Sequence, residues 1–203
     1  MKTPRIILAS TSRYRRELLS RLHIPFETRS PTTDEQPLPR EQPAALVRRL
    51  SEAKAASMGP DAPNSLIIGS DQVAVLDGDI LGKPGNRAAT IRQLSRAAGR
   101  QVTFLTGISL FNTHTNRFET DIAPFSVWFR DLTAGQIEHY VDREQPFDCA
   151  GGFKSEHLGI ALFARMEGDD PTALVGLPLI RLVAMLQRQG VDVLGPSPFV
   201  PEP

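Results

Sequence analysis

The chain has 203 residues, of which 40% are hydrophobic and 23% are charged, a composition typical of a soluble globular protein. Its 23 basic and 23 acidic side chains balance, which argues against a dedicated nucleic-acid-binding protein, since such proteins carry a basic surplus. No apolar run approaches the roughly 20 residues needed to span a bilayer, and the run Ile6–Ala9 is too short for a signal peptide. We therefore expect neither a membrane segment nor a stable nucleic-acid complex.

The cysteine and histidine content bears on redox compartment and on zinc. Cys149 is the single cysteine, so an internal disulfide is excluded and the reducing cytoplasm is the expected location. The four histidines are scattered, without the spacing of zinc ligands. The sequence thus gives no sign of a zinc site.

The first predicted unit is a strand, a hydroxyl-rich loop and a helix. Ile6–Ala9 is typical of a buried strand, and the loop from Ser10 leads to a helix that begins near Ser12, a favourable N-cap residue. Backbone N–H groups and the helix dipole favour an anion here, and Arg15 and Arg16 can add charge-assisted bonds to phosphate oxygens. A capped helix with solvated arginines is the alternative. Because arginines in a first helical turn oppose the dipole, we favour a phosphate site.

The next predicted unit leads to a lysine on an apolar helix face. A strand at Phe26–Arg29 and a loop at Pro31–Pro43 precede a helix at Ala44–Met58. Lys54 falls on the apolar stripe of that helix. An inward lysine either extends to water, which is the commoner outcome, or meets a buried anion. Lys54 is therefore a candidate ligand contact.

The central stretch runs from Leu66 to Pro84. Leu66–Ile68 is apolar and β-branched, as a short buried strand should be, and Gly, Ser, Asp and Gln follow it. Ligands in open α/β sheets lie just beyond the carboxyl ends of strands, so Asp71 is a catalytic candidate. An aspartate that merely caps the turn after the strand is an equally open alternative.

A hairpin and a rigid turn follow Asp71. Asp77-Gly78 between the apolar runs Val73–Leu76 and Ile80–Leu81 is a strong hairpin signal. Gly82-Lys83-Pro84 then places a lysine on a turn. The spacing does not match a Walker phosphate loop, and proline replaces its Ser or Thr.

The remaining segments predict a mixed sheet flanked by helices. Adjacent strand-like runs favour antiparallel pairing, and the helix starts carry capping residues. The predicted helices are 87–98 after Asn86, 133–143 and 178–189, and the predicted strands are 102–111, 118–122, 125–130 and 159–163.

Two further segments are distinctive. Ala150–Glu156 contains two glycines, which permit close backbone approach, followed by a lysine, a serine and a glutamate. A polar loop is the alternative there. Residues 195–203 contain four prolines and are expected to form a disordered tail. Residues 1–194 show no internal repeat and no linker, so we expect a single domain.

Taken together, the motifs resemble the Maf family of nucleoside triphosphate pyrophosphatases, and within it the branch that acts on 7-methyl-GTP. The resemblance spans residues 6–189. It rests on these motifs in this order: Ser10–Arg16, Asp34-Glu35, Lys54, Gly69–Gln72, Gly82–Pro84, Cys149–Glu156 and Val175–Pro178.

The resemblance implies an elongated α/β fold of the kind that inosine triphosphatases have, with two lobes, a central cleft and a mixed sheet. It implies cleavage between the α and β phosphates, a divalent cation such as Mg²⁺ or Mn²⁺, and a homodimer. By similarity, Asp71 accepts the proton of the attacking water, with Lys83 as a second catalytic residue. The implied phosphate contacts are Ser10, Ser12, Arg15, Arg16 and Lys54, and the implied metal ligands are Glu35 and Asp71.

The resemblance also implies a three-position readout of the base by Tyr14, Gln72 and Glu156. A 7-methylated guanine ring is cationic, which an aromatic face attracts, and a carboxylate accepts from the N1 and N2 donors of guanine. Two alternatives remain at this point. One is a pyrophosphatase acting on dTTP and UTP, and the other is a non-catalytic nucleotide-binding regulator of cell division.

Overall fold

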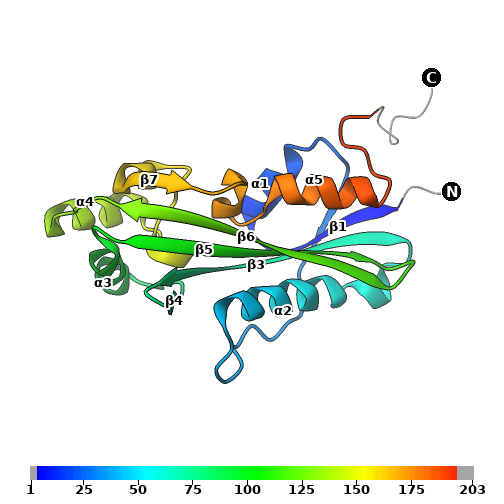
Figure 1. The fold of residues 1–203 in the computed structure, drawn as a ribbon, viewed down its shortest axis with the longest axis horizontal. Coiled ribbons are helices and arrows are strands. Elements are labelled where there is room, and N and C mark those ends of the chain that lie inside the picture. The colour runs from blue at the N-terminus through cyan, green and yellow to red at the C-terminus, as the bar shows by residue number, and fades with distance from the viewer. Residues whose placement is uncertain (1–3, 196–203) are drawn as a thin grey trace.

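Three long strands run along the molecule and carry its other elements (Figure 1). The computed structural model describes residues 4–195; of the tail predicted at 195–203, residues 196–203 lie outside this range. Within that range no helix is both long and apolar enough to cross a membrane. The strands are β1 (Arg5–Ala9), β2 (Glu27–Arg29), β3 (Ser65–Leu76), β4 (Asp79–Leu81), β5 (Gln101–Asn112), β6 (Arg117–Phe129) and β7 (Phe163–Glu167).

The strands form one mixed sheet, which confirms the predicted fold class. Its order is β2-β1-β3-β5-β6-β7, with β4 paired to β3. β1 pairs in parallel with β2 and β3, whereas the pairs of β3 with β4 and β5, of β5 with β6 and of β6 with β7 are antiparallel.

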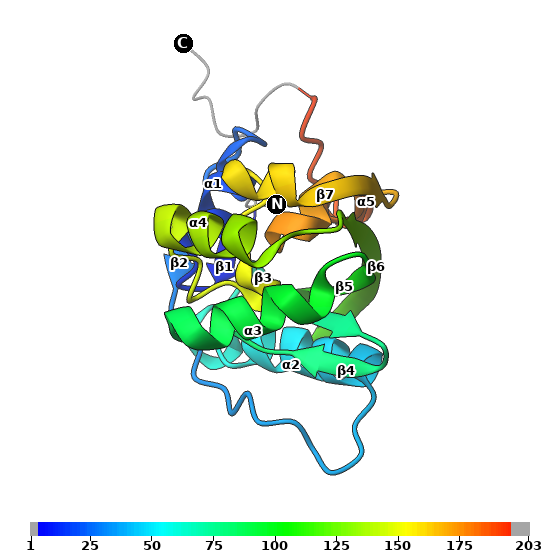
Figure 2. The same cartoon turned by 90° about the vertical axis from the view of Figure 1, so that its left-hand side faces the viewer.

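Helices cover both faces and one end of this sheet. α2 lies along one face, α1 and α5 lie on the other, and α3 and α4 gather at one end (Figures 1 and 2). The α-helices are α1 (Arg13–Ser20), α2 (Pro43–Ala56), α3 (Arg87–Ala97), α4 (Ala134–Glu144) and α5 (Leu179–Arg188). The short 3₁₀ helices are η1 (Gly59–Asp61), η2 (Ala150–Gly152), η3 (Leu158–Leu162) and η4 (Pro171–Val175).

Side-chain caps explain why three helices begin where they do. Ser12 Oγ accepts from the Arg15 amide before α1, and Asn86 Oδ1 accepts from the Ala89 amide at 2.9 Å before α3. Thr133 and Gln136 form a reciprocal capping box at α4. Each cap satisfies amides that have no partner inside the helix. These three predicted starts are confirmed.

The hydrophobic core divides into two parts along the sheet. At one end, α3 and α4 pack on the sheet around edge-to-face aromatic pairs that join Phe153 to Phe104, Phe129 and Phe163. At the other end, α1 and α5 bury one face of β1 and β3, and α2 covers the opposite face. The two predicted lobes are therefore present, and they share one sheet.

The structure corrects the prediction of a short strand at Leu66–Ile68. β3 continues without a break to Leu76 and pairs with β5 from Leu66–Asn112 to Val75–Thr103. The polar run after Ile68 resembled a strand end. It stays extended because β5 supplies hydrogen-bond partners along its whole length.

Two other strand predictions were also wrong. The segments 118–122 and 125–130 form the single strand β6, in which Pro124 pairs with Leu105. β7 pairs with β6 from Ser126 onward, so the edge beside Pro124 has room for a proline without loss of a ladder bond. The strand predicted at 159–163 is instead η3, and β7 begins at Phe163.

Two strand glycines allow α2 to lie close to the sheet. A Cβ added at Gly69 would be 2.1 Å from the carbonyl oxygen of Ser51, and one added at Gly107 would be 2.5 Å from that of Val47. Both obstacles are helix backbone, which cannot move aside as a flexible side chain does. The glycines thereby set the height of α2, and with it that of Lys54, above β3.

We expect Gly69→Ala to lower the melting temperature and to reduce the free energy of unfolding by about 1–3 kcal/mol, the usual cost of overpacking. Gly135→Ala is the matched control, since a Cβ there meets nothing within 4 Å and the residue lies in α4. Helix propensity makes that control neutral or slightly stabilising. Equal thermal stability of the two variants would contradict the close-approach explanation.

Candidate active site

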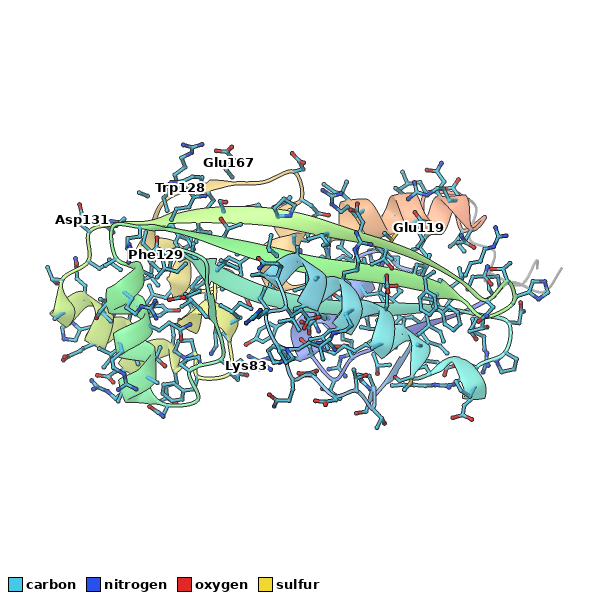
Figure 3. All side chains as sticks on the ribbon, turned by 60° about the horizontal axis from the view of Figure 1, so that its bottom comes forward. Lys83, Glu119, Trp128, Phe129, Asp131 and Glu167 are labelled. Carbon is cyan, nitrogen blue, oxygen red and sulfur yellow. The ribbon has the colours of Figure 1, made fainter. Side chains whose placement is uncertain are left out.

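A cleft of about 710 Å³ opens between the two lobes, within the size range of small-ligand sites. Figure 3 shows Lys83 between the lobe of α3 and α4 and the lobe covered by α2. Of the residues predicted for the site, the cleft gathers Ser10, Ser12, Tyr14, Arg15, Glu35, Lys54, Asp71, Gln72, Lys83 and Glu156.

Asp71 reaches this cleft through a gap in the pairing of β3. On the edge of β3 away from β5, β1 pairs as far as Ile68 and β4 begins at Ala74. Asp71 falls between these points, where this edge of β3 has no strand partner, and it lines the cleft. The prediction that Asp71 follows the end of a strand was therefore wrong, because Asp71 lies inside β3. It does lie just beyond Ile68, the last residue of β3 that pairs with β1.

An ammonium lies between two carboxylates at the centre of the site. Lys54 Nζ is 2.6 Å from Asp71 Oδ1 and 2.7 Å from Glu35 Oε1. The Lys54 side chain is 6% exposed, so of the two alternatives left open by the sequence, this lysine turns inward and meets carboxylates rather than extending to water; the predicted contact with phosphate stays a prediction. Strand alternation explains the contact, because Gly69 and Asp71 point to the same face of β3, which α2 covers.

Cations concentrate around these carboxylates. The hydrogen bond from Lys54 lowers the pKa of Glu35, and the charges of Lys54, Lys83 and Arg15 lower it further against the opposing effect of burial. Burial lowers the pKa of Arg15, while the charges of Asp71 and Glu35 oppose that shift. An arginine nevertheless stays protonated in proteins. The cleft therefore holds ionised groups of both signs.

Arg15 is oriented by the segment 171–177. Its Nε donates to the carbonyl oxygen of Gly176 at 2.8 Å. Ser70 Oγ, fully buried on the other face of β3 from Asp71, lies 2.9 Å from the same carbonyl oxygen. The backbone of Gly176 has a φ of 110°, a conformation that favours glycine. Its carbonyl thus joins α1 to β3.

Gln72 is held by the same segment. Its Nε2 lies 2.7 Å from the carbonyl oxygen of Ala173, 3.2 Å from that of Leu174 and 2.9 Å from Thr106 Oγ1. An amide nitrogen has two hydrogens, so these contacts use its donor capacity. The atom of Gln72 that can still bind a ligand in the cleft is Oε1, an acceptor.

Tyr14 lines the cleft with one ring face already in contact. The Arg13 guanidinium lies 4.7 Å from the ring centroid, and its Nη2 donates to Tyr14 Oη at 2.9 Å. Burial raises the pKa of Tyr14, and the Arg13 hydrogen bond partly offsets the rise. Glu156 is exposed and accepts from Ser155 Oγ at 3.2 Å.

Arg16 is the predicted site residue that the structure does not bring into the cleft. It is exposed and lines an adjoining hollow of about 310 Å³, whose wall also includes Arg29 from β2. Helical geometry gives the reason, since consecutive residues point about 100° apart around an α-helix. Arg16 lies one position further around α1 than Arg15, and its side chain lines the hollow instead of the cleft.

The cleft is also lined by residues for which the sequence predicted no role, among them Arg13, Asp148 and Cys149. Burial raises the pKa of the Cys149 thiol to about 12, so this thiol stays protonated near neutral pH and is a poor nucleophile. The sequence feature that could have indicated Asp148 is its place just after Pro146, in the loop that follows α4.

The carboxylates of Glu35 and Asp71, which both line the cleft, are the oxygen donors that could hold a metal there. Within residues 4–195, no group of three or more His, Cys, Asp or Glu side chains could hold a metal alone. Mg²⁺ commonly uses one or two carboxylates together with water and substrate phosphates. Glu35 and Asp71 each have one oxygen bonded to Lys54 Nζ, and their second oxygens are the atoms that could meet such a cation.

The comparisons with known proteins cover nearly the whole chain. Residues 5–189 match the Maf family, described as Maf-like protein. Proteins named 7-methyl-GTP pyrophosphatase are 54% identical over 190 residues in Aliivibrio fischeri and in Pseudomonas aeruginosa, covering 94% of this chain and 98% and 99% of theirs. A solved Staphylococcus aureus Ham1 protein matches with a TM-score of 0.49 and 12% identity over 91% of this chain and 99% of that one. On its match to the family and to these relatives, the chain belongs to the Maf family.

Proposed function

We propose that this protein hydrolyses 7-methyl-GTP to 7-methyl-GMP and pyrophosphate. The observation that carries the proposal is the convergence of Arg15, Lys54, Lys83 and Asp71 in one cleft between the lobes. Relatives with 54% identity that bear the name 7-methyl-GTP pyrophosphatase support the choice of substrate.

The cations would bind the triphosphate. Arg15, Lys54 and Lys83 offer charge to phosphate oxygens, and Lys54 also holds Asp71 and Glu35 beside them. Charge that builds on phosphate oxygens during the reaction is stabilised by fixed positive groups in a partly desolvated site. Ser10 and Ser12 line the same cleft.

Asp71 would act as the proton acceptor for the attacking water. Water adds across the anhydride between the α and β phosphates; pyrophosphate leaves, and the water proton passes to the carboxylate. Lys54 Nζ, 2.6 Å from Oδ1, fixes the orientation of that carboxylate.

A divalent cation, Mg²⁺ or Mn²⁺, would be held by Glu35 and Asp71. When bound, such a cation neutralises phosphate charge and lowers the pKa of bound water. The support for this proposal is the pair of carboxylates in the cleft and the preference of these cations for oxygen ligands.

Base recognition would combine an aromatic face with acceptors. The Tyr14 ring would attract the cationic 7-methylguanine. Gln72 Oε1 and the Glu156 carboxylate would accept from the guanine N1–H and N2–H groups, which adenine lacks. All three side chains line the cleft.

The experiment is a substrate panel with magnesium and a pyrophosphate assay. We expect 7-methyl-GTP to be hydrolysed with a higher kcat/KM than GTP, ATP, dTTP and UTP. Preference for dTTP and UTP would replace the proposed substrate. Tight nucleotide binding without hydrolysis of any of them would replace the enzyme with a nucleotide-binding regulator.

We also propose a cytoplasmic location and a homodimeric state. The single cysteine, which excludes an internal disulfide, supports the location. The homodimer is supported by the family resemblance, and sedimentation of the purified protein tests it.

A further inference from the structure

A buried carboxylate, that of Asp170, lies outside the cleft in the loop between β7 and η4. Asp170 is 2% exposed, whereas its neighbour Asp169 is exposed. A buried carboxylate is costly unless it is hydrogen-bonded. The hydrogen bonds of the Asp170 carboxylate therefore indicate its structural role.

The Asp170 carboxylate ties η4 to the start of α5. Oδ1 accepts from Thr172 N at 3.1 Å and from Thr172 Oγ1 at 2.5 Å. Oδ2 accepts from Ile180 N at 2.8 Å and from Arg181 N at 3.4 Å. Thr172 Oγ1 also accepts from Leu179 N at 2.8 Å. One carboxylate oxygen thus binds the beginning of the segment 171–177, and the other binds the start of α5, just after that segment.

The segment closed by these bonds supplies carbonyl oxygens to the site. Gln72 Nε2 donates to Ala173 and Leu174, and Arg15 Nε donates to Gly176. The base-contacting and phosphate-contacting side chains are thus positioned by one stretch of backbone. We infer that Asp170 is a positioning residue, which holds the segment 171–177 so that Gln72 and Arg15 face the substrate.

Replacement by asparagine separates this role from simple packing. An amide nitrogen cannot accept a hydrogen bond, so Asp170→Asn leaves the donors on one side, at Thr172 or at the start of α5, without their acceptor. The segment would shift, and Gln72 would lose its fixed carbonyl partners. Asp169→Asn is the matched control, because it makes the same chemical change at an exposed position.

The measurement is the ratio of kcat/KM for 7-methyl-GTP to that for ATP, and it rests on the proposed function. We expect Asp170→Asn to lower this ratio roughly 10-fold, within the range that hydrogen-bonded recognition supplies, and to raise KM. Asp169→Asn should leave both unchanged. A variant that only unfolds more readily loses activity equally on both nucleotides, and an unchanged ratio and KM in folded Asp170→Asn would overturn the inference.

A double-mutant cycle tests the route through Gln72. In a Gln72→Ala background, Asp170→Asn should change the ratio by less than about twofold, since coupled residues are not additive. An equal effect in both backgrounds would refute the coupling. If Asp170→Asn does not fold, Thr172→Val replaces it in the test, because this substitution removes one donor to Asp170. We expect Thr172→Val to lower the ratio as well, by a smaller factor. An unchanged ratio in that variant would refute the inference.

Failure of the proposed function gives a different result from failure of the inference about Asp170. If the wild-type protein hydrolyses no 7-methyl-GTP, that function is wrong. The dissociation constants of 7-methyl-GTP and ATP, measured by calorimetry for the wild-type and Asp170→Asn proteins, then supply the same ratio.

Discussion

Asp71→Asn is expected to lower kcat for 7-methyl-GTP by about 10²-fold or more, because general base catalysis typically contributes that much. The substitution keeps the shape of the side chain and an oxygen that accepts from Lys54 Nζ, but it removes the basic carboxylate. KM should change far less than kcat. Steady-state kinetics with a pyrophosphate assay gives both values.

Asp79→Asn is the control for this change. Asp79 lies on β4, and its exposed carboxylate pairs with Arg96 away from the cleft, so turnover should stay at the wild-type value. Near-normal turnover in folded Asp71→Asn would remove Asp71 from the role of proton acceptor.

Lys54→Met is expected to destabilise the protein by about 3 kcal/mol, since removing one partner of a buried ion pair leaves an uncompensated charge. Lys54 and Asp71 have side chains 6% and 13% exposed. The pKa of Glu35 should rise, because the Lys54 hydrogen bond is the largest cause of its lowering. Chemical denaturation measures the free energy, and carboxyl NMR titration measures the pKa.

The pH dependence follows from the direction of that shift. A carboxyl whose pKa is lowered by folding stabilises the protein above its unfolded pKa, and this stabilisation is lost as pH falls through the folded pKa. The stability difference between wild type and Lys54→Met should therefore be largest near neutral pH and shrink in acid. Arg87→Met is the control, since Arg87 pairs with Asp142 at an exposed position and surface pairs contribute little. A difference that grows in acid would contradict the assigned cause.

The locally encoded features were predictable from the sequence. Asp77-Gly78 gives the turn between β3 and β4, and both residues have positive φ values of 51° and 88°. The Thr133–Gln136 capping box begins α4 as expected. In these cases the interacting groups are within a few residues of each other, so sequence spacing determines their contact.

Features that depend on a distant partner were not predictable in the same way. β3 stays extended along its polar residues because β5 pairs with it. The role inferred for Asp170 depends on hydrogen bonds from the amides of Ile180 and Arg181, which η4 brings close to it. Arg16 shared every local property with Arg15, but the cleft lies on the side of α1 that Arg15 faces.

The sequence by itself determined the charged residues, their order and the helices that carry Arg15 and Lys54. Only the tertiary structure decided that Lys54 meets Asp71 and Glu35, since that contact needs α2 to pack against glycines of β3 and β5. It also decided where the cleft opens, because the pairing of β1 and β4 leaves one stretch of the β3 edge uncovered. The physical reason is that local spacing constrains neighbours along the chain, whereas a site between lobes depends on which distant backbones can approach closely enough to bond.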